Sequence, residues 1–273
     1  MPLSDMERLG IIAGNGKFPL ILAENARREG LEVIVVALEE EADPAIERLA
    51  SRVYWLSITQ LGKLIKTFQK EGVTKAVMAG QVVKRRMYTS DILKLDLTAA
   101  RLWASLPDRR GDTILKAIAD ELSRNGIELQ DSTLYMGPYL AVKGKMTKTA
   151  PAGAVQADIE FGYRMAKVIA EYDIGQSVVV KDLSVVAVEA VEGTDNCIRR
   201  AGELGRGGIV VVKVSKKGHD MRFDVPVVGI RTLESLKEAG AKALAVEAGK
   251  TLMLEKEELL SGADKAGITI VGI

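Results

Sequence analysis

A strand, turn and helix pattern near the amino terminus constrains the fold of this chain more than any other feature. Residues 9–38 read LGIIAGNGKFPLILAENARREGLEVIVVAL, with a turn containing Gly14 and Gly16 between an apolar run and a helical stretch, and a second apolar run at 33–38. This order predicts two parallel strands joined by a helix. Pro19 stands where a dinucleotide-binding turn has its third glycine, and proline starts a helix without allowing close helix packing. The pattern does not decide which ligand the turn binds.

The same alternation continues through about residue 130. Further apolar runs lie at 53–56 and 76–79, and helices are expected near 92–103 and 113–124. Alternating strands and amphipathic helices predict a mostly parallel sheet that helices cover on both faces. The predicted fold class is therefore α/β, with a Rossmann-like domain at the amino terminus.

A second α/β domain is expected in the other half. Residues 136–153 are rich in proline, glycine and lysine without sustained periodicity, which predicts a linker and loop region. We therefore divide the chain into a nucleotide-binding-like domain, 1–133, and a carboxyl-terminal domain, 134–273, that carries candidate catalytic carboxylates. The pattern predicts a helix at 155–171 and strands at 177–180, 183–190, 208–213, 243–246 and within 267–273.

Composition excludes several classes of partner. The 273 residues carry 38 Lys and Arg against 37 Asp and Glu, so no global field recruits nucleic acid. One cysteine, Cys197, and one histidine, His219, argue against a zinc site, and a metal here would be a hard cation on carboxylates. No apolar stretch approaches the roughly 20 residues of a membrane span, and the start resembles no signal peptide. We expect a cytoplasmic protein without a nucleic-acid partner.

The turn at residues 14–17 is the first candidate site. Backbone N–H groups there, including that of Asn15, would face a phosphate at the positive end of the following helix. The alternative is a plain tight turn, since a two-glycine motif is weak. A nicotinamide cofactor is less favoured, because Glu39 is the only acidic candidate near the end of the second strand.

A basic loop follows the strand expected at 76–79. Gly80 precedes Lys84, Arg85 and Arg86. Ligands of open α/β sheets bind beyond the carboxyl ends of the strands, so this loop is expected over the same crevice as the Gly14 turn. The alternative is a solvated basic loop.

The segment SVVAVEAVEGTDN, residues 184–196, places acidic residues at a strand end. Glu189, Glu192 and Asp195 are candidates to share a Mg²⁺ ion that holds a diphosphate. The alternative is that Thr194 or Asp195 caps the following helix. The two interpretations are compatible.

Asp224 is flanked by apolar residues, just ahead of Pro226 and an expected strand at 227–230. Solubility explains such an acid poorly. The alternative is an Asp that bonds its own backbone in a turn. His219 and Cys197 are interpreted as structural or incidental.

Taken together, these segments resemble one family, the UDP-2,3-diacylglucosamine pyrophosphatases of the LpxI type. The motifs that carry the resemblance occur in the family's order and are IIAGNGKFPLILAENA, MAGQV, MTKTAPAG, DIGQSVVV, VVAVEAVEGTD and RFDVPVVG. The last three are specific, whereas the turn motifs are weak. The resemblance runs from about Leu9 to the expected terminal strand.

The resemblance implies a two-domain cytoplasmic enzyme of lipid A biosynthesis. It would hydrolyse UDP-2,3-diacylglucosamine to 2,3-diacylglucosamine 1-phosphate (lipid X) and UMP with a divalent metal, Mg²⁺ or Mn²⁺. It also implies a homodimer that holds its glycolipid nucleotide between the domains, with transient peripheral contact at the inner membrane surface. The alternatives are a nicotinamide-dependent oxidoreductase and a non-catalytic nucleotide-binding module.

The matching motifs and the residue patterns described above together give the expected site residues. The catalytic aspartate of the family falls on Asp224. Expected substrate-binding residues are Gly14, Asn15, Gly16, Gly80, Arg85, Lys148, Gln176, Thr194 and Asp195. Expected metal ligands are Glu189, Glu192, Asp195 and Asp224. His219 stands where the family leads us to expect glutamine, which puts a substrate contact from that position in doubt.

Overall fold

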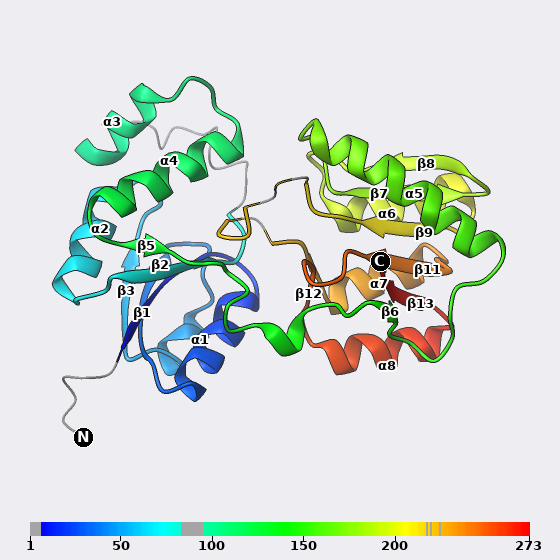
Figure 1. Cartoon of the computed structure of the whole chain (residues 1–273), viewed down its shortest axis with the longest axis horizontal. Coiled ribbons are helices and arrows are strands. Elements are labelled where there is room, and N and C mark those ends of the chain that lie inside the picture. Colours follow the sequence, from blue (N-terminus) through cyan, green and yellow to red (C-terminus); the bar gives the residue numbers. More distant parts are fainter. Residues whose placement is uncertain (1–6, 83–94, 217, 219, 224) are drawn as a thin grey trace. The chain divides into compact units, whose positions relative to one another are not determined.

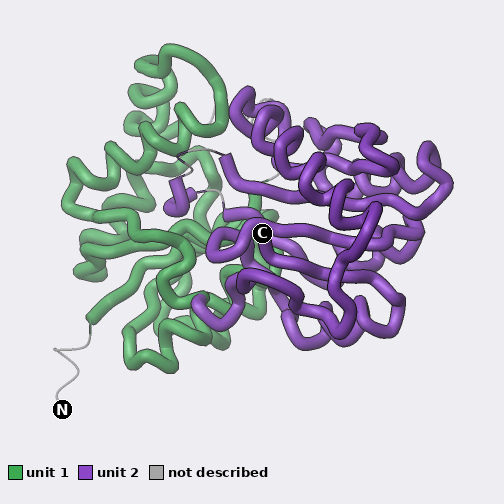
Figure 2. The backbone as a smooth tube through the Cα atoms, turned by 45° about the vertical axis from the view of Figure 1, so that its right-hand side comes forward, with its two compact units in different colours: residues 1–136 green, residues 137–273 purple. Residues whose placement is uncertain are grey.

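The computed structural model describes residues 7–82, 95–216, 218, 220–223 and 225–273. The chain separates into two compact units, Met1–Met136 and Gly137–Ile273, drawn in two colours in Figure 2. Each unit contains its own sheet covered by helices, so the predicted α/β fold class is confirmed.

Unit 1 is built on a five-stranded sheet in which every pair of neighbours is parallel. Its order is β3-β2-β1-β4-β5. The strands are β1 (Arg8–Ala13), β2 (Glu32–Leu38), β3 (Arg52–Leu56), β4 (Lys75–Ala79) and β5 (Glu128–Leu129). Strand β2 is apolar along almost its whole length because helices bury both of its faces.

Helices lie on both faces of this sheet (Figure 1). Helix α1 (Phe18–Arg28) packs on β1 and β2, while α2 (Leu61–Lys70) and α4 (Gly111–Arg124) cover the opposite face, and α3 (Leu97–Ser105) packs on α2. Pro19 lies in the first turn of α1, where its missing N–H costs nothing. A short 3₁₀ helix, η1 (Pro44–Arg48), connects β2 to β3. The direction of the connections reverses beside β1 and β4, and ligands of such sheets bind at that point.

Unit 2 is built on a six-stranded mixed sheet of order β6-β13-β11-β9-β7-β8. Its strands are β6 (Gly144–Lys145), β7 (Ser177–Lys181), β8 (Ser184–Val188), β9 (Val210–Lys213), β11 (Ala243–Val246) and β13 (Thr269–Gly272). Strands β9, β11 and β13 are parallel, whereas β7 runs antiparallel to both β8 and β9. A separate parallel pair joins β10 (Val227–Val228) to β12 (Leu252–Met253).

Two hydrophobic layers enclose the six-stranded sheet. Helix α5 (Ala154–Glu171) packs on one face through Ile159, Ala166 and Ala170. Helices α6 (Thr194–Gly205), α7 (Ile230–Glu238) and α8 (Lys256–Ala266) bury the other face in a larger core. The terminal strand expected in residues 267–273 is β13, a fully hydrogen-bonded member of the sheet.

One local prediction was wrong, and one region predicted as loop contains two short regular elements. The strand expected at 227–230 stops at Val228, because Gly229 is the N-cap residue of α7. The region expected to be linker and loop contains a 3₁₀ turn, η4 (Gly137–Tyr139), and β6, which adds an edge to the sheet. Its short strand pairing depends on β13 at the far end of the chain, so no local pattern could indicate it. None of the described helices is long and apolar enough to cross a membrane.

Candidate functional site

In unit 1, the Gly14 turn and the loop after β4 bind each other. The N–H of Gly14 donates to the carbonyl of Ala79 (2.8 Å), and Asn15 exchanges two backbone hydrogen bonds with Gln81 (2.7 and 3.0 Å). The structure therefore brings the two loops together at the carboxyl edge of the sheet. The amides of Gly14 and Asn15 are used by the protein itself, which corrects the expectation that they face a phosphate and also argues against a nicotinamide pyrophosphate on them.

The glycines of these loops have different roles. A Cβ atom on Gly14 would lie 2.6 Å from the carbonyl oxygen of Gln81, and one on Gly80 would lie 2.6 Å from that of Asn15. Both glycines are required because the two backbones pass in contact. Gly16 has a φ of +96° but no neighbour within 4 Å of an added Cβ, so it is required by conformation alone and faces open space.

The basic part of the second loop, with Lys84, Arg85 and Arg86, lies outside the described residues. Its proposed contact with a diphosphate stays a prediction. Asp224 and His219 also lie outside the described residues.

In unit 2, polar side chains gather where β8 and β9 end and β7 begins. Ser177 and Lys213 are directly paired in the antiparallel β7–β9 ladder, so their side chains project from the same face of the sheet. The N–H of Glu189 donates to the carbonyl of Ser177 (3.0 Å), and α6 starts at Thr194. We call Ser177, Glu189, Thr194 and Lys213 the edge cluster.

A chain of hydrogen bonds runs through the edge cluster. Lys213, only 6% exposed, donates from Nζ to Thr194 Oγ1 (2.6 Å), and Thr194 Oγ1 donates to Glu189 Oε1 (2.9 Å). Two further atoms, Glu189 Oε2 and Ser177 Oγ, are buried and have no hydrogen-bond partner among the described residues. A buried polar atom without a partner costs about 1–3 kcal/mol, so two of them in one place require an explanation.

Of the expected substrate-binding residues in unit 2, Gln176 and Thr194 lie at this edge. The carbonyl of Gln176 accepts from the N–H of Val214 (2.9 Å), directly beyond Lys213. A Cβ on the preceding residue, Gly175, would lie 2.1 Å from the carbonyl oxygen of Glu189, so only glycine allows these two strands to approach.

Lys148 lies at the opposite edge. It follows β6, which runs antiparallel to β13, and its backbone N–H donates to Asp264 Oδ1 (2.7 Å) near the end of α8. Its main chain is therefore beside the amino end of β13. The structure does not bring Lys148 to the edge cluster.

The acidic turn before α6 is largely engaged with arginine. Arg200 Nη2 lies 2.5 Å from Glu192 Oε1, and this hydrogen bond lowers the pKa of Glu192 below its ordinary value. Asp195 Oδ2 lies 3.8 Å from Arg231 Nε. The N-cap residue of α6 is Gly193 without a side-chain cap, so the interpretation of Thr194 or Asp195 as the cap was wrong.

The described carboxylates do not by themselves fit a divalent cation. Among the described residues, no group of three His, Cys, Asp or Glu side chains could hold a metal ion. The two carboxylate oxygens of Glu192 accept hydrogen bonds from Arg200 and from the N–H of Ala190 (3.1 Å). Glu189 Oε2 has no partner among the described residues, but Thr194 Oγ1 connects Glu189 to the buried ammonium of Lys213, which would repel a cation.

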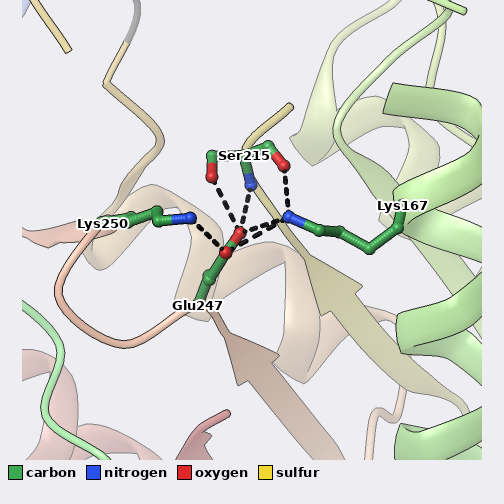
Figure 3. A network of polar contacts seen from close by, with 4 residues as sticks. All are labelled: Lys167, Ser215, Glu247 and Lys250. Atoms are coloured by element: carbon green, nitrogen blue, oxygen red, sulfur yellow. Dashed lines mark hydrogen bonds and ion pairs between the residues drawn. The ribbon is translucent and has the colours of Figure 1, made fainter. Parts of the chain in front are cut away.

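A second polar network, drawn in Figure 3, lies beyond the ends of β9 and β11. Glu247 accepts hydrogen bonds from the N–H and Oγ of Ser215 (2.9 and 2.8 Å), from Lys250 Nζ (2.7 Å) and from Lys167 Nζ on α5 (3.1 and 3.2 Å). Its side chain is buried, which opposes ionisation, but the bonds from Lys250, Ser215 and Lys167 prevail and lower the pKa of Glu247 to about 2.

Sequence reasoning missed Ser177, Lys213 and Glu247. One signal was present, because Lys213 ends the apolar run VVVK and Glu247 follows the apolar run ALAV. A charge that directly ends a buried strand is positioned at the carboxyl edge of the sheet, where ligands of α/β proteins bind.

The fold and the carboxyl edges of the two sheets define the class of protein. It is a two-unit α/β protein whose polar groups gather at the carboxyl ends of parallel strands. A model of the LpxI N-terminal domain matches residues 8–138, and a model of the LpxI C-terminal domain matches residues 142–271. UDP-2,3-diacylglucosamine pyrophosphatase LpxI of Caulobacter vibrioides is 32% identical in an alignment of 279 positions, gaps included, that covers 98% of each chain. The chain belongs to the LpxI family.

Solved structures of other families show only distant likeness. The biotin carboxylase domain of a thermophilic 2-oxoglutarate carboxylase matches with a TM-score of 0.27 and 11% identity over 64% of this chain and 35% of its own. The biotin carboxylase subunit of pyruvate carboxylase matches with a TM-score of 0.28 and 11% identity over 74% and 42%. The chain spans less than half the length of either, and scores this low support no argument.

Proposed function

We propose that this protein hydrolyses UDP-2,3-diacylglucosamine in lipid A biosynthesis, with 2,3-diacylglucosamine 1-phosphate and UMP as products. The observation that carries the proposal is the match to both LpxI domains together with the near-complete overlap with the Caulobacter vibrioides enzyme. The occupied amides of Gly14 and Asn15 speak against the nicotinamide alternative.

Asp224 is the proposed catalytic residue. A carboxylate that orients the attacking water assists hydrolysis of a diphosphate, whose negative charge must be screened before water attacks. The main chain two residues further on is anchored, since the N–H of Leu252 donates to the carbonyl of Pro226 (2.8 Å). This hydrogen bond fixes the main chain at Pro226, within the motif that contains Asp224.

A divalent metal, Mg²⁺ or Mn²⁺, belongs to the proposal on chemical grounds. When bound, it would neutralise diphosphate charge as a Lewis acid. The homodimer, the cytoplasmic location and the transient contact with the inner membrane are proposed from the family resemblance.

The reaction is tested with the full chain and UDP-2,3-diacylglucosamine, followed by ³¹P NMR in ¹⁸O-labelled water. We expect UMP and a glycolipid 1-phosphate to appear, the label to identify the attacked phosphorus, and EDTA to stop the reaction until Mg²⁺ or Mn²⁺ is added. Absence of UMP with the metal present would refute the activity, while full turnover in EDTA would refute only the metal.

The catalytic assignment is tested with Asp224→Ala and Asp224→Asn. Each is expected to lower kcat by roughly 10²-fold or more, about 3 kcal/mol, while substrate Kd and Tm change little. Asparagine serves well in turns, so a turn-forming role predicts an active Asn variant. A fully active, normally folded Asp224→Asn protein would therefore reject the assignment.

A further inference from the structure

The edge cluster contains more hydrogen-bonding capacity than the protein uses. A threonine hydroxyl has one proton and two lone pairs. The proton of Thr194 goes to Glu189 Oε1, and one lone pair accepts from Lys213 Nζ. Thr194 can therefore accept one more hydrogen bond but cannot donate one.

The other three side chains divide into donors and acceptors. Lys213 Nζ has three N–H groups, and Thr194 is its one side-chain acceptor among the described residues. Ser177 Oγ, in a residue with no exposed surface, has no described partner and can donate. Glu189 Oε2 has no described partner and can only accept while ionised. The unused groups are thus donors and acceptors side by side.

This mixture selects the chemistry of a ligand. A phosphate would be attracted by Lys213 but repelled by the carboxylate of Glu189, and a metal cation would meet the reverse conflict. A hydroxyl group both donates and accepts, so it suits a carboxylate beside an ammonium. The helix that starts at Thr194 adds only a weak positive potential and excludes neither a neutral ligand nor a sugar.

We propose that the edge cluster binds a pair of sugar hydroxyls, which donate to Glu189 and accept from Lys213 and Ser177. The inference rests on the proposed function, because the sugar nucleotide offers two candidate pairs: the adjacent 2′ and 3′ hydroxyls of ribose and the 4- and 6-hydroxyls of the acylated glucosamine. Glu189 and Thr194 are each only half-buried, so the cluster reaches the surface at this turn. Rotation of the Glu189 carboxylate exchanges its two oxygens between Thr194 and the ligand.

Binding to the full chain is measured by titration calorimetry with two pairs of probes. One pair is UMP and 2′,3′-dideoxyuridine 5′-monophosphate, and the other is glucosamine 1-phosphate and its 4-deoxy analogue. We expect the protein to prefer the hydroxylated member of one pair about tenfold or more, the usual value of a hydrogen bond to a charged group. The pair that shows the preference identifies the sugar.

Variants connect the preference to the edge cluster. Glu189→Gln should abolish the preference and leave the affinity for the deoxy probe nearly unchanged. Ser177→Ala should reduce the preference about threefold with an unchanged Tm, since its hydroxyl has no described partner to lose. Glu203→Gln, which makes the same change on the exposed side of α6, is the matched control and should retain the full preference.

The inference is overturned if neither pair shows a preference, if none of the probes binds, or if Glu189→Gln retains the preference. If Glu189→Gln does not fold, Ser177→Ala decides, and an undiminished preference in that variant has the same meaning. The hydrolysis assay on the same preparation separates the two proposals. Turnover without a hydroxyl preference refutes only the sugar site, and a hydroxyl preference without turnover refutes only the proposed reaction.

Discussion

The carboxyl edges of the two sheets are built in opposite ways. In unit 1, two glycine-containing loops satisfy each other through backbone hydrogen bonds between Asn15 and Gln81. In unit 2, the edge is lined by side chains, and Thr194 connects the buried Lys213 to the half-buried Glu189. At the first edge the amides of Gly14 and Asn15 are already bonded, whereas at the second Ser177 Oγ and Glu189 Oε2 have no partner among the described residues.

The difference teaches that the carboxyl ends of the strands in two sheets of one chain need not form the same kind of binding site. Glycines bring backbones together and remove polar groups from a binding surface, as Gly14 and Gly80 do. Charged and hydroxyl residues at strand ends bring side-chain polarity into a buried layer, which is expensive unless something satisfies it. A motif rich in glycine is therefore weak support for phosphate binding until its amides are accounted for.

The largest effect is expected from Gly80→Ala. The added Cβ would meet the backbone of Asn15, and the φ of +90° is itself unfavourable for alanine. We expect the free energy of unfolding to fall by roughly 3–5 kcal/mol. Trp55 and Trp103, the only two tryptophans, both belong to unit 1, so tryptophan fluorescence during urea unfolding measures the loss.

Gly16→Ala is the matched control for that change. Its φ of +96° is equally unusual, but the added Cβ meets nothing, so the expected cost is only about 1 kcal/mol. Equal losses in the two variants would contradict the claim that the Gly80 loop is held by backbone contact.

The second largest change in the free energy of unfolding is expected at Glu247, whose carboxylate oxygens all have hydrogen-bond partners in unit 2. Glu247→Gln should lower the free energy of unfolding at pH 7 by roughly 2–3 kcal/mol, because Lys167, Lys250 and Ser215 lose a charged acceptor. The pKa of Glu247 falls from 4.5 to about 2 on folding, so its contribution is present above pH 4.5 and is lost as the pH falls towards 2.

Thermal unfolding of the parent protein and Glu247→Gln between pH 7 and pH 2 measures this contribution. The Tm values of the two proteins should converge as the pH approaches 2. A constant difference in Tm across the range would show that the network stabilises unit 2 without the charge of Glu247.

The smallest effect is expected at Cys197, which is buried in the core beneath the edge cluster. Cys197→Ala should cost about 1 kcal/mol, as for a small apolar side chain. Burial raises the pKa of the thiol from 9.0 to about 11. The unfolded chain therefore ionises first, and the stability advantage of the parent over Cys197→Ala is present below pH 9 and shrinks as the pH rises towards 11.

Urea unfolding of both proteins at pH 7, 9 and 10.5 checks this direction. An advantage that grows with pH would mean that the thiolate is stabilised inside unit 2, contrary to its apolar surroundings. Compared with each other, Glu247→Gln and Cys197→Ala distinguish the stability that the buried charge of Glu247 contributes from the stability that the apolar core contributes.

Much of the fold follows from local patterns. Strands β1 to β4 coincide with the apolar runs to within one or two residues, because strands buried on both faces must be apolar throughout. Helix α5 begins one residue before the expected position, since its 3.6-residue periodicity lies within one continuous stretch. Family membership was also readable, because the motifs occur in order along the chain.

The candidate site was only partly readable. The sequence indicated Gln176 and Thr194 as substrate-binding residues and Glu189 as a metal ligand. It also assigned Glu192 to the metal, although Arg200, 8 positions further along the chain, binds that carboxylate. It also assigned Lys148 to the substrate, while β6 holds that residue's main chain beside the amino end of β13. Periodicity and composition contain no information about such pairings between distant residues.

The sequence by itself determined the α/β class, the positions of most strands and helices, and the family, because these depend on side-chain patterns within a few residues of each other. Tertiary structure alone decided which polar groups meet. Ser177 and Lys213 are 36 positions apart in sequence and become neighbours through the antiparallel placement of β7 beside β9. Strand order and register are cooperative properties of the whole sheet, so only the folded chain reveals that the amides of Gly14 and Asn15 are bonded and that Ser177 Oγ and Glu189 Oε2 have no described partner.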